Sequence, residues 1–331
     1  MAIAFRNSFI VVFEKRLRRH WTRLFGLLVE LYGRHYDFYY HLEAIIAAAA
    51  RSWLDRSADL KALDERREAD PLWFQSQEMV GGVLYVDLFS DNIARLLDVN
   101  LNILTDFKDL NDSRLVEHWE PIIRSTGDWD VFRSLGYKPS SRAATDFLTF
   151  DRENPNSIIN CLIAARQNAR IIRDQIPSEV FEAINDTYLH LRESGSDEVW
   201  KAGPYQFYQE IQTFSQLFQG MVASTVVRGL GYYFMESGKF IERADKSSRI
   251  LDIKYHILLP SVRDVGGVVD TAQWTAVLRS CSAFEAYHRN YVKNVDPTLV
   301  TEFLLFSAKF PRAVRYCLAR LGENLNLISH N

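Results

Sequence analysis

The sequence is short of the residues from which several common kinds of site are built. Its three cysteines, Cys161, Cys281 and Cys317, are odd in number and far apart, and they lack metal-ligand spacing. We therefore expect reduced thiols in a cytoplasmic protein. The sequence contains no phosphate-binding glycine loop, no Ser/His/Asp arrangement and no zinc pattern. It therefore excludes the most familiar catalytic motifs and leaves any metal or other cofactor unknown.

Long apolar runs and an excess of positive charge are also missing. The longest purely aliphatic run, Ala44–Ala50, is far shorter than a membrane span. The N-terminus places its charged residues after its apolar ones, which is the reverse of a secretory signal. The net charge of -3 argues against general nucleic-acid binding, which needs a basic surface. We expect neither a membrane segment nor a nucleic-acid partner.

The stretch Gly238–Pro260 carries the strongest pattern in the chain. Wound as a helix, it places apolar residues on one broad arc and a second apolar ridge, Ile250, Ile253 and Ile257, on the other side of a polar strip. That strip consists of Glu242, Asp245, Arg249, Asp252 and His256. Because apolar residues flank the charges on both sides, we expect the strip to face other protein or an enclosed site.

The same pattern occurs a second time. Asp91–Leu104 and Asp245–Leu258 share an aspartate, then three residues, an arginine, an aliphatic residue, a leucine and a second aspartate. In the first copy the polar strip is Asp91, Arg95, Asp98 and Asn102. The repeat predicts two helices that present matching strips to each other. Two copies this far apart are too few for a solenoid.

These segments resemble bacterial alpha-E domain proteins, a family of helical proteins. The similarity lies in DNIARLLDVNLNIL, in LTFDRENPNSIINCLIAARQNARIIRDQI and in FIERADKSSRILDIKY. The resemblance implies an association with ATP-grasp ligases and transglutaminase-like peptidases in making or handling a peptide modification. It also implies a Glu-Arg pair before each copy. The second copy has Glu242-Arg243, but the first has Leu88 and Phe89, so one acidic partner is missing.

A further helix, expected over Ile158–Ile176, carries arginines at helical spacing. Arg166, Arg170 and Arg173 share one face, and buried arginines need anionic partners. The strip of Glu242, Asp245 and Asp252 is the natural internal partner of these arginines. Two interpretations stay open: a structural ion-pair network that fixes helix register, or a site for an anionic substrate. In the second, Glu242 or Asp245 serves as general base or metal ligand. The candidate catalytic residues are Glu242, Asp245 and Asp252, and the candidate substrate-binding residues are Arg95, Asp98, Arg166, Arg170, Arg173 and Arg249.

The rest of the C-terminal part alternates between loop signals and helical patterns. Residues 105–142 are rich in turn formers, and Trp119 and Trp129 are expected to anchor them to the core. Further helices are expected over Ser178–Glu193, Tyr205–Val227, Thr271–Val292 and Pro297–Leu321. In the second of these, Gln212, Gln216 and Gln219 either supply hydrogen bonds to the site or lie on the surface.

The N-terminal segment differs in character from the rest. The words RHYDFYYHLEAIIAAAARSWLDR, LKALDERREADPLWFQSQ and MVGGVLYVDLF resemble the helical N-terminal region of amylosucrases, the last being similar to their first barrel strand. The resemblance stops near Leu97, and the other strands and the carboxylate pair of a glycosyl-transfer site have no counterpart. One short strand near residues 83–87 is expected, with edges that could pair in a homo-oligomer.

The sequence therefore predicts an all-α helical bundle with a short helical leader at residues 1–90 and an alpha-E domain at residues 91–331. One hypothesis is a component of a peptide-modification pathway, with an ATP-grasp ligase and a transglutaminase-like peptidase as partners. The alternative is a non-catalytic helical scaffold whose charges are structural. Carbohydrate chemistry is disfavoured because the barrel is missing.

Overall fold

The computed structural model describes residue 83 and residues 90–101, 119–257, 267–291 and 294–329. Regular structure in this part of the chain is helical, without a strand, which confirms the all-α prediction. After the helical residues 90–101 come α5 (Trp119–Thr126), α6 (Trp129–Ser134), α7 (Ser141–Thr145), the π-helical turn η2 (Asp146–Phe150), α8 (Ile158–Ile171), α9 (Ser178–Glu193), α10 (Ser196–Ala202), α11 (Pro204–Thr225), α12 (Leu230–Ile257), α13 (Val268–Ser280), α14 (Phe284–Asn290), α15 (Pro297–Phe306) and α16 (Val314–Ser329).

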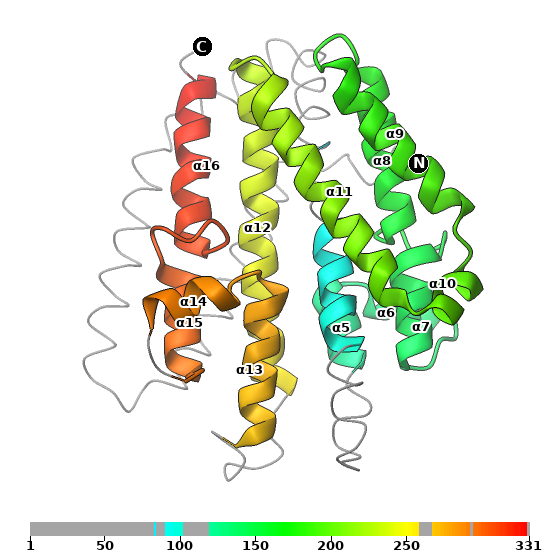
Figure 1. Ribbon diagram of the computed structural model, residues 1–331, viewed down its shortest axis with the longest axis vertical. Helices are drawn as coiled ribbons and strands as arrows, with labels where there is room; N and C mark the ends of the chain where they lie inside the picture. Colours follow the sequence, from blue (N-terminus) through cyan, green and yellow to red (C-terminus); the bar gives the residue numbers. More distant parts are fainter. Residues whose placement is uncertain (1–82, 84–89, 102–118, 258–266, 292–293, 330–331) are drawn as a thin grey trace.

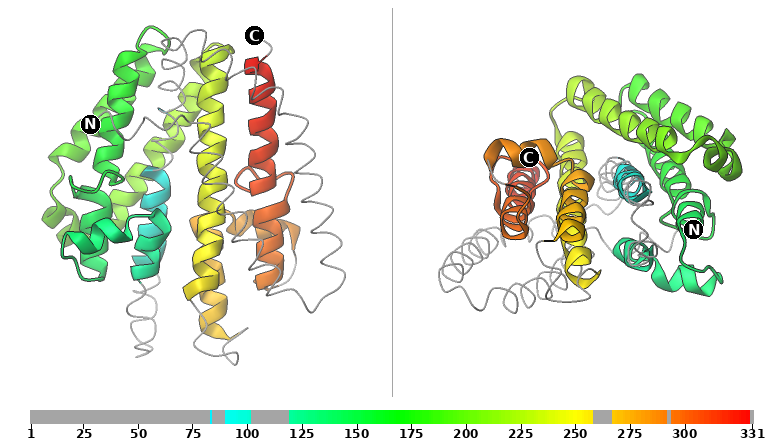
Figure 2. Two further views of the ribbon diagram at one scale, coloured as in Figure 1. Left: turned by 180° about the vertical axis from the view of Figure 1, so that it is seen from behind. Right: turned by 60° about the horizontal axis from the view of Figure 1, so that its bottom comes forward.

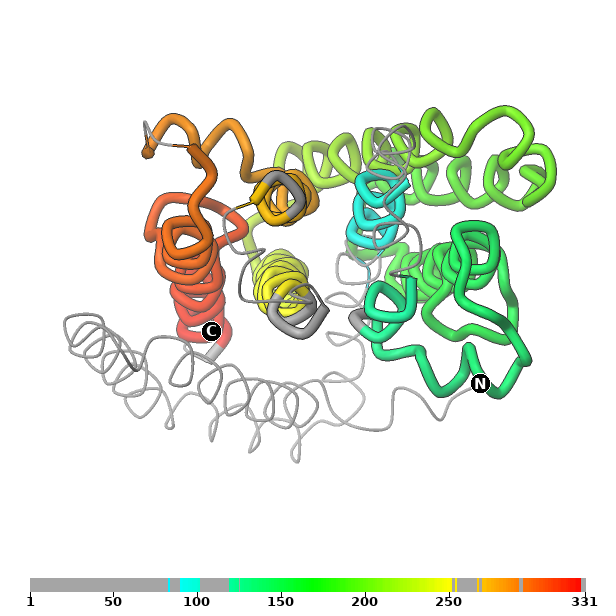
Figure 3. The backbone as a smooth tube through the Cα atoms, turned by 90° about the horizontal axis from the view of Figure 1, so that it is seen from below, coloured from blue at the N-terminus to red at the C-terminus, as the bar shows by residue number. Residues whose placement is uncertain are grey.

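The long helix α12 is the central element of this arrangement. It runs between α16 on one side and helix 90–101 with α5 on the other (Figures 1 and 3). Its most extensive packing is against α16, and it also contacts α5, α13 and α15. The helix contains the predicted Gly238–Pro260 segment but begins at Leu230, because the buried Gly238 lies inside the helix and does not start it. The second copy of the repeat therefore lies in the middle of the molecule.

Helices α8, α9 and α11 form the other flank. Helix α9 packs against both α8 and α11, and α11 crosses obliquely from α10 to the start of α12 (Figures 1 and 2). Proline helps to begin α11, since Pro204 occupies the first turn, where a backbone N–H has no helical partner. The bounds of α9 match the predicted helix, and those of α11 differ by one residue at the start and two at the end.

The apolar core is divided by α12. One cluster joins helix 90–101 to α5, α8 and α11 and includes Trp119, Phe132, Phe147 and Tyr208. A second lies between α12 and the C-terminal helices, around Leu251, and a third lies between α8, α9, α11 and the start of α12. Polar side chains at the middle of α12 are therefore enclosed between two apolar regions.

The expectation of a loop over residues 105–142 is wrong for its described part, which contains α5, α6 and the start of α7. Turn-forming residues are present, but they lie between short helices: Gly127 and Gly136 have positive φ values of 87° and 79°. The expected role of the tryptophans is confirmed. Trp119 is buried and Trp129 packs against the same cluster.

Two predicted C-terminal helices are each broken in two. Between α13 and α14, Ser282 has a φ of 51°, and the N–H groups of Ser282 and Ala283 donate to the carbonyls of Arg279 and Leu278. This hydrogen-bond pattern is a Schellman motif, which ends a helix. Between α15 and α16 the chain includes Pro311, which cannot donate to a continuous helix. Helix α8 likewise ends at Ile171, before the predicted Ile176.

Much of the N-terminal segment lies outside the described residues. This applies to the amylosucrase-like words, to Leu88 and Phe89, and to the expected strand apart from Val83, which is helical and buried. The division at residue 90 and the homo-oligomer stay predictions. None of the described helices contains an apolar stretch of the length that a membrane span requires.

Candidate functional site

The carboxyl group of Glu242 lies at the centre of the candidate site. Its residue is fully buried, at 0% exposure, on the side of α12 that meets helix 90–101. The Asn92 side-chain amide donates to Glu242 Oε1 at 3.0 Å. The other carboxyl oxygen, Oε2, has no hydrogen-bond partner among the described residues. The predicted contact between the two repeat helices therefore exists, and it includes an acid with a free oxygen.

The surroundings of Glu242 favour its protonated form. Burial raises the pKa of this carboxyl group to about 7, and the negative charge of Asp245 acts in the same direction. Lys246, Asn92 and Arg249 oppose the shift without cancelling it. A carboxyl group with this pKa can both release and accept a proton near neutral pH.

Two more ionisable side chains are enclosed beside Glu242. Lys246 is buried, and burial lowers its pKa while the charge of Glu242 acts in the opposite direction. Asp128, between α5 and α6, is also buried; burial raises its pKa, and Lys246 is among the charges that lower it. Asp128 Oδ2 has no hydrogen-bond partner in the described structure. The two acids thus lie within the electrostatic range of one lysine.

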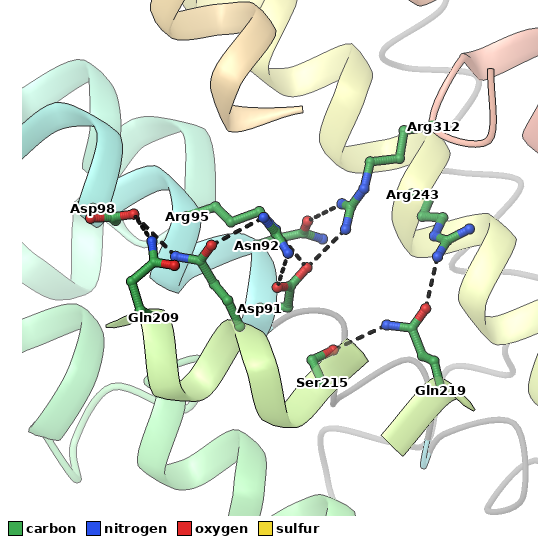
Figure 4. A network of polar contacts seen from close by, with 10 residues as sticks. Asp91, Asn92, Arg95, Asp98, Gln209, Ser215, Gln219, Arg243 and Arg312 are labelled. Atoms are coloured by element: carbon green, nitrogen blue, oxygen red, sulfur yellow. Dashed lines mark hydrogen bonds and ion pairs between the residues drawn. The ribbon is translucent and has the colours of Figure 1, made fainter. Parts of the chain in front are cut away.

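Helix 90–101 contributes a second set of charges, shown in Figure 4. Arg95 Nε donates to Asp91 Oδ2 at 3.0 Å, and Arg312 Nη2 donates to the same oxygen at 2.9 Å. Arg312 Nη1 also donates to Asn92 Oδ1 at 3.1 Å. Asn92 therefore connects Glu242 to Arg312, and the buried Asp91 holds both arginines in place.

The network continues along α11. Arg95 Nη1 donates to Gln212 Oε1 at 3.0 Å, and the amides of Gln209 and Gln212 donate to Asp98 Oδ2 at 2.8 and 3.2 Å (Figure 4). Asp98 therefore accepts hydrogen bonds from two neutral amides. Of the predicted glutamines, Gln212 and Gln219 join the network, whereas Gln216 is exposed.

The two repeat copies make the same local ion pair. Asp245 Oδ2 accepts from Arg249 Nε at 2.7 Å, as Asp91 accepts from Arg95 one helix away. Both pairs join residues four apart on one helix face. The first Asp–Arg pair of each predicted strip is therefore present, and in each copy the aspartate holds the arginine of its own helix. Asn102 and the side chains of Asp252 and His256 lie outside the described residues.

A family model described as a predicted alpha-helical domain with a conserved ER motif, named Alpha-E, matches residues 90–331. The chain belongs to the Alpha-E family. Glu242-Arg243 is the only Glu-Arg pair in the matched range of the sequence. The motif named in the family description therefore coincides with the buried acid of the site and with the arginine that follows it.

Curated relatives of this Alpha-E protein are described as uncharacterised. Mb2597 of Mycobacterium bovis and MT2643 of Mycobacterium tuberculosis are each 28% identical to the chain over 262 residues, and Rv2567 of Mycobacterium tuberculosis is 27% identical over the same length. Each match covers 71% of this chain and 28% of the relative. The Alpha-E chain thus spans less than a third of the length of these relatives. No solved structure matches it.

Among the described residues, the arginines of α8 do not pair with Glu242 or Asp245, so the prediction that they pair with the acidic strip of this Alpha-E domain is wrong for these two acids. Arg166 Nε donates to Asn185 at 2.8 Å, and its guanidinium lies over the Tyr188 ring. Arg170 and Arg173 are exposed, and Arg173 lies over the Phe181 ring. The buried residues of α8 include Ile159, Leu162 and Ala165, so its apolar face points inward and the arginines remain on the other side. Any role of these arginines in substrate binding stays a prediction.

The remaining predicted residues of the Alpha-E site are placed as follows. Glu242, Asp245, Arg249, Arg95 and Asp98 lie in the networks described above. Asp252 belongs to α12, but its side chain is outside the described part, as is that of His256. In the described ranges no group of three His, Cys, Asp or Glu side chains could hold a metal ion. The three cysteines are free and buried, and burial raises the pKa of each thiol.

Four important residues of this Alpha-E site were missed by sequence reasoning. Asn92 and Lys246 occupy equivalent positions, each directly after the first aspartate of its copy. That equivalence was a usable signal, because both side chains act on Glu242. Asp128 and Arg312 carry no such signal, since they reach the site from distant parts of the chain.

Proposed function

We propose that this Alpha-E protein takes part in peptide modification together with an ATP-grasp ligase and a transglutaminase-like peptidase, and that Glu242 transfers a proton in that process. The family resemblance supports the pathway. The greater length of the mycobacterial relatives, more than two thirds of which lies outside the match, is consistent with a domain that works beside others.

The observation that carries the proposal is the state of Glu242. It is fully buried, its pKa is raised to about 7, and Oε2 has no hydrogen-bond partner among the described residues. Carboxyl groups that serve as proton donors and acceptors are tuned in this way by burial and by neighbouring charges. An amine or amide of a peptide substrate supplies the kind of proton that such a group moves.

The residues around Glu242 then have positioning roles. The Asn92 side-chain amide donates to Glu242 Oε1 at 3.0 Å, which leaves Oε2 as the oxygen that transfers the proton. Asp245 keeps the pKa of Glu242 high, whereas Lys246 and Arg249 limit the shift. Arg95 and Arg312, both held by Asp91, fix the helix from which Asn92 projects.

A non-catalytic scaffold is the second candidate, favoured by the extent of the ion-pair network. Asp91, Asn92 and Arg312 connect helix 90–101 to the segment before α16, and such a network can fix the register of packed helices. In that case the buried charges serve the packing of α12, and the surface of the molecule binds the ligase or the peptidase.

Replacing Glu242 by glutamine separates the two candidates. Glutamine preserves size and can still accept from Asn92, but it cannot transfer a proton at neutral pH. If Glu242 is functional, Glu242→Gln abolishes complementation of a deletion strain while the melting temperature does not fall below that of the wild type. A large drop in melting temperature with complementation and partner binding intact would favour the scaffold.

Glu120→Gln is the matched control. Glu120 lies at the start of α5 and forms an ion pair with Arg124 in which both side chains are well exposed. Loss of this exposed pair has little effect on stability. Glu120→Gln should therefore complement as well as the wild type, and a loss of function in both variants would show that the assay responds to charge in general.

A further inference from the structure

The guanidinium of Arg243 has an unusual set of neighbours. Arg243 Nη2 donates to the Gln219 side-chain carbonyl at 2.7 Å, and Gln219 in turn donates to Ser215 (Figure 4). Arg243 Nε is buried and has no acceptor among the described residues. Arg243 forms no ion pair with a described residue, and the group that accepts its hydrogen bond is a neutral amide.

Burial and a second cation both act on Arg243. Burial lowers the pKa of Arg243 to about 10, and the nearby positive charge of Arg312 acts in the same direction, whereas Cys317, Glu236 and Asp91 oppose the shift without cancelling it. Figure 4 shows Arg312 turned towards Asp91 and Asn92 and Arg243 turned towards Gln219. A half-buried arginine beside a second arginine is unfavourable unless an anion compensates it.

The neighbouring cations each have a carboxylate. Lys239, one turn earlier on α12, pairs with Glu236; Arg312 pairs with Asp91; and Arg320 on α16 pairs with Glu323. Each of these three cations therefore has an anionic partner, although Arg312 shares Asp91 with Arg95. Arg243, which is half-buried, has no carboxylate partner among the described residues.

We infer that Arg243, with Arg312 beside it and Gln219 orienting it, binds an oxyanion of the substrate, either a carboxylate or a phosphate. Arginine suits both groups, because its planar fork can donate two parallel hydrogen bonds to a pair of oxygens. Arg243 directly follows Glu242 on α12, and Asn92 connects that acid to Arg312. The inference rests on the proposed function and deepens it by naming the charge of the ligand.

Titration calorimetry on the full chain tests the inference with defined probes at constant ionic strength. Inorganic phosphate is one probe; N-acetyl-Ala-Ala, which has a free carboxylate, is the other, with its C-terminal amide as the uncharged control. We expect saturable binding of phosphate or of the free carboxylate, and none of the amide. The probe that binds identifies the oxyanion. Failure of both to bind would overturn the inference.

Variants show whether Arg243 is the residue that binds the anion. Arg243→Gln should weaken binding of the probe at least tenfold. Arg243→Lys keeps the charge without the planar fork, so its affinity should lie between those of Arg243→Gln and the wild type. Arg320→Gln is the control, because Arg320 is exposed and already paired. Equal binding by Arg243→Gln and the wild type, or an equal loss in Arg320→Gln, would contradict the assignment.

Stability gives an independent readout. Because the charge of Arg243 lacks an anionic partner in the described structure, Arg243→Met should raise the melting temperature of the ligand-free protein and remove the increase that the bound probe causes. An arginine with a purely structural role would give a lower melting temperature when replaced. A lower melting temperature of Arg243→Met, together with no probe binding by the wild type, would contradict the inference.

The same measurements separate the anion site at Arg243 from the proton-transfer role of Glu242. Glu242→Gln should bind the probe at least as tightly as the wild type, because it removes a negative charge near the anion. Anion binding with full complementation by Glu242→Gln would refute the proton-transfer role alone. Loss of complementation by Glu242→Gln without anion binding in the wild type would refute the anion site alone.

Discussion

Glu242 and its neighbours show how a helix of ordinary composition can hold a perturbed acid. Burial raises the pKa of the carboxyl group to about 7, and Asp245 contributes in the same direction. The Asn92 amide and two cations stabilise the charged form, but they cannot replace the lost hydration. The balance leaves the group half-ionised near neutral pH, which makes pH the natural variable for testing it.

The first prediction concerns the pH dependence of stability. The pKa of Glu242 is raised on folding, so its neutral form contributes stability that is fully present below the unfolded pKa and is lost as pH rises through the folded pKa of about 7. Relative to wild type, Glu242→Gln should therefore gain stability between about pH 4.5 and pH 7, by on the order of 3 kcal/mol. Urea unfolding at several pH values measures this, and a constant difference would contradict it.

The second prediction concerns Asn92. Asn92→Leu removes the donor to Glu242 and the acceptor of Arg312, so it should destabilise the protein by about 1–3 kcal/mol and raise the pKa of Glu242 further. Chemical denaturation and the pH profile of stability measure the two effects. Asn100→Leu is the control, because among the described residues Asn100 donates to the Leu96 carbonyl of its own helix and to no other group. A similar loss of stability in both variants would show that the contacts of Asn92 with Glu242 and Arg312 add nothing to those within its own helix.

At the scale of elements, α12 is held to its neighbours by buried charge as well as by apolar contact. Lys254 Nζ donates to Asp270 Oδ1 at 2.7 Å and to Gln273 at 2.9 Å, which joins α12 to α13. The side chains of Lys254 and Asp270 are only 3% and 4% exposed, so neither charge can be solvated if its partner is lost. This ion pair fixes the position of α13 along α12.

The third prediction tests that ion pair. Asp270→Leu leaves Lys254 buried without its counter-ion and should destabilise the protein by about 3–5 kcal/mol, whereas the double variant Lys254→Met/Asp270→Leu should recover most of the loss. Thermal and chemical denaturation measure both. The exposed pair of Arg142 and Asp197 is the control, since Asp197→Ala should change stability by less than about 1 kcal/mol. Equal effects at the two sites would refute the role assigned to burial.

At the scale of the whole molecule, the site depends on helices from both ends of the described chain. Helix 90–101 supplies Asp91 and Asn92, α12 supplies Glu242, and the segment before α16 supplies Arg312. The family model covers residues 90–331 and thus includes all of these groups. Val83 also matters, because it is fully buried against the cluster of α8, α9 and α11.

The fourth prediction follows for the truncated protein. A chain of residues 82–331 retains Val83 and the matched range, so it should keep its helical circular dichroism, melt in one cooperative transition and bind the same anion as the full chain. Spectroscopy and calorimetry on both chains measure this. A molten or aggregated product would show that residues before 82 complete the core.

Periodicity is reliable where a helix is long and its faces differ. The bounds of α9 and the matching Asp–Arg pairs of the two repeat copies follow from spacing along one helix, because residues four apart always meet. The breaks near Ser282 and Pro311 were missed, since an apolar pattern can continue across a short turn. The arginine face of α8 was given the wrong partners for a different reason: spacing shows which residues share a face and not which element that face meets.

The sequence by itself determined the helical class, the two related helices and the presence of a confined acid at Glu242, because these depend on local spacing and on the balance of apolar and charged residues. Only the tertiary structure decided which groups act on that acid. Asp128 and Arg312 reach the network through the packing of distant segments, and Arg243 is left without a carboxylate among the described residues by the same packing. Burial and charge at a site are sums over neighbours in space, and a linear pattern does not contain them.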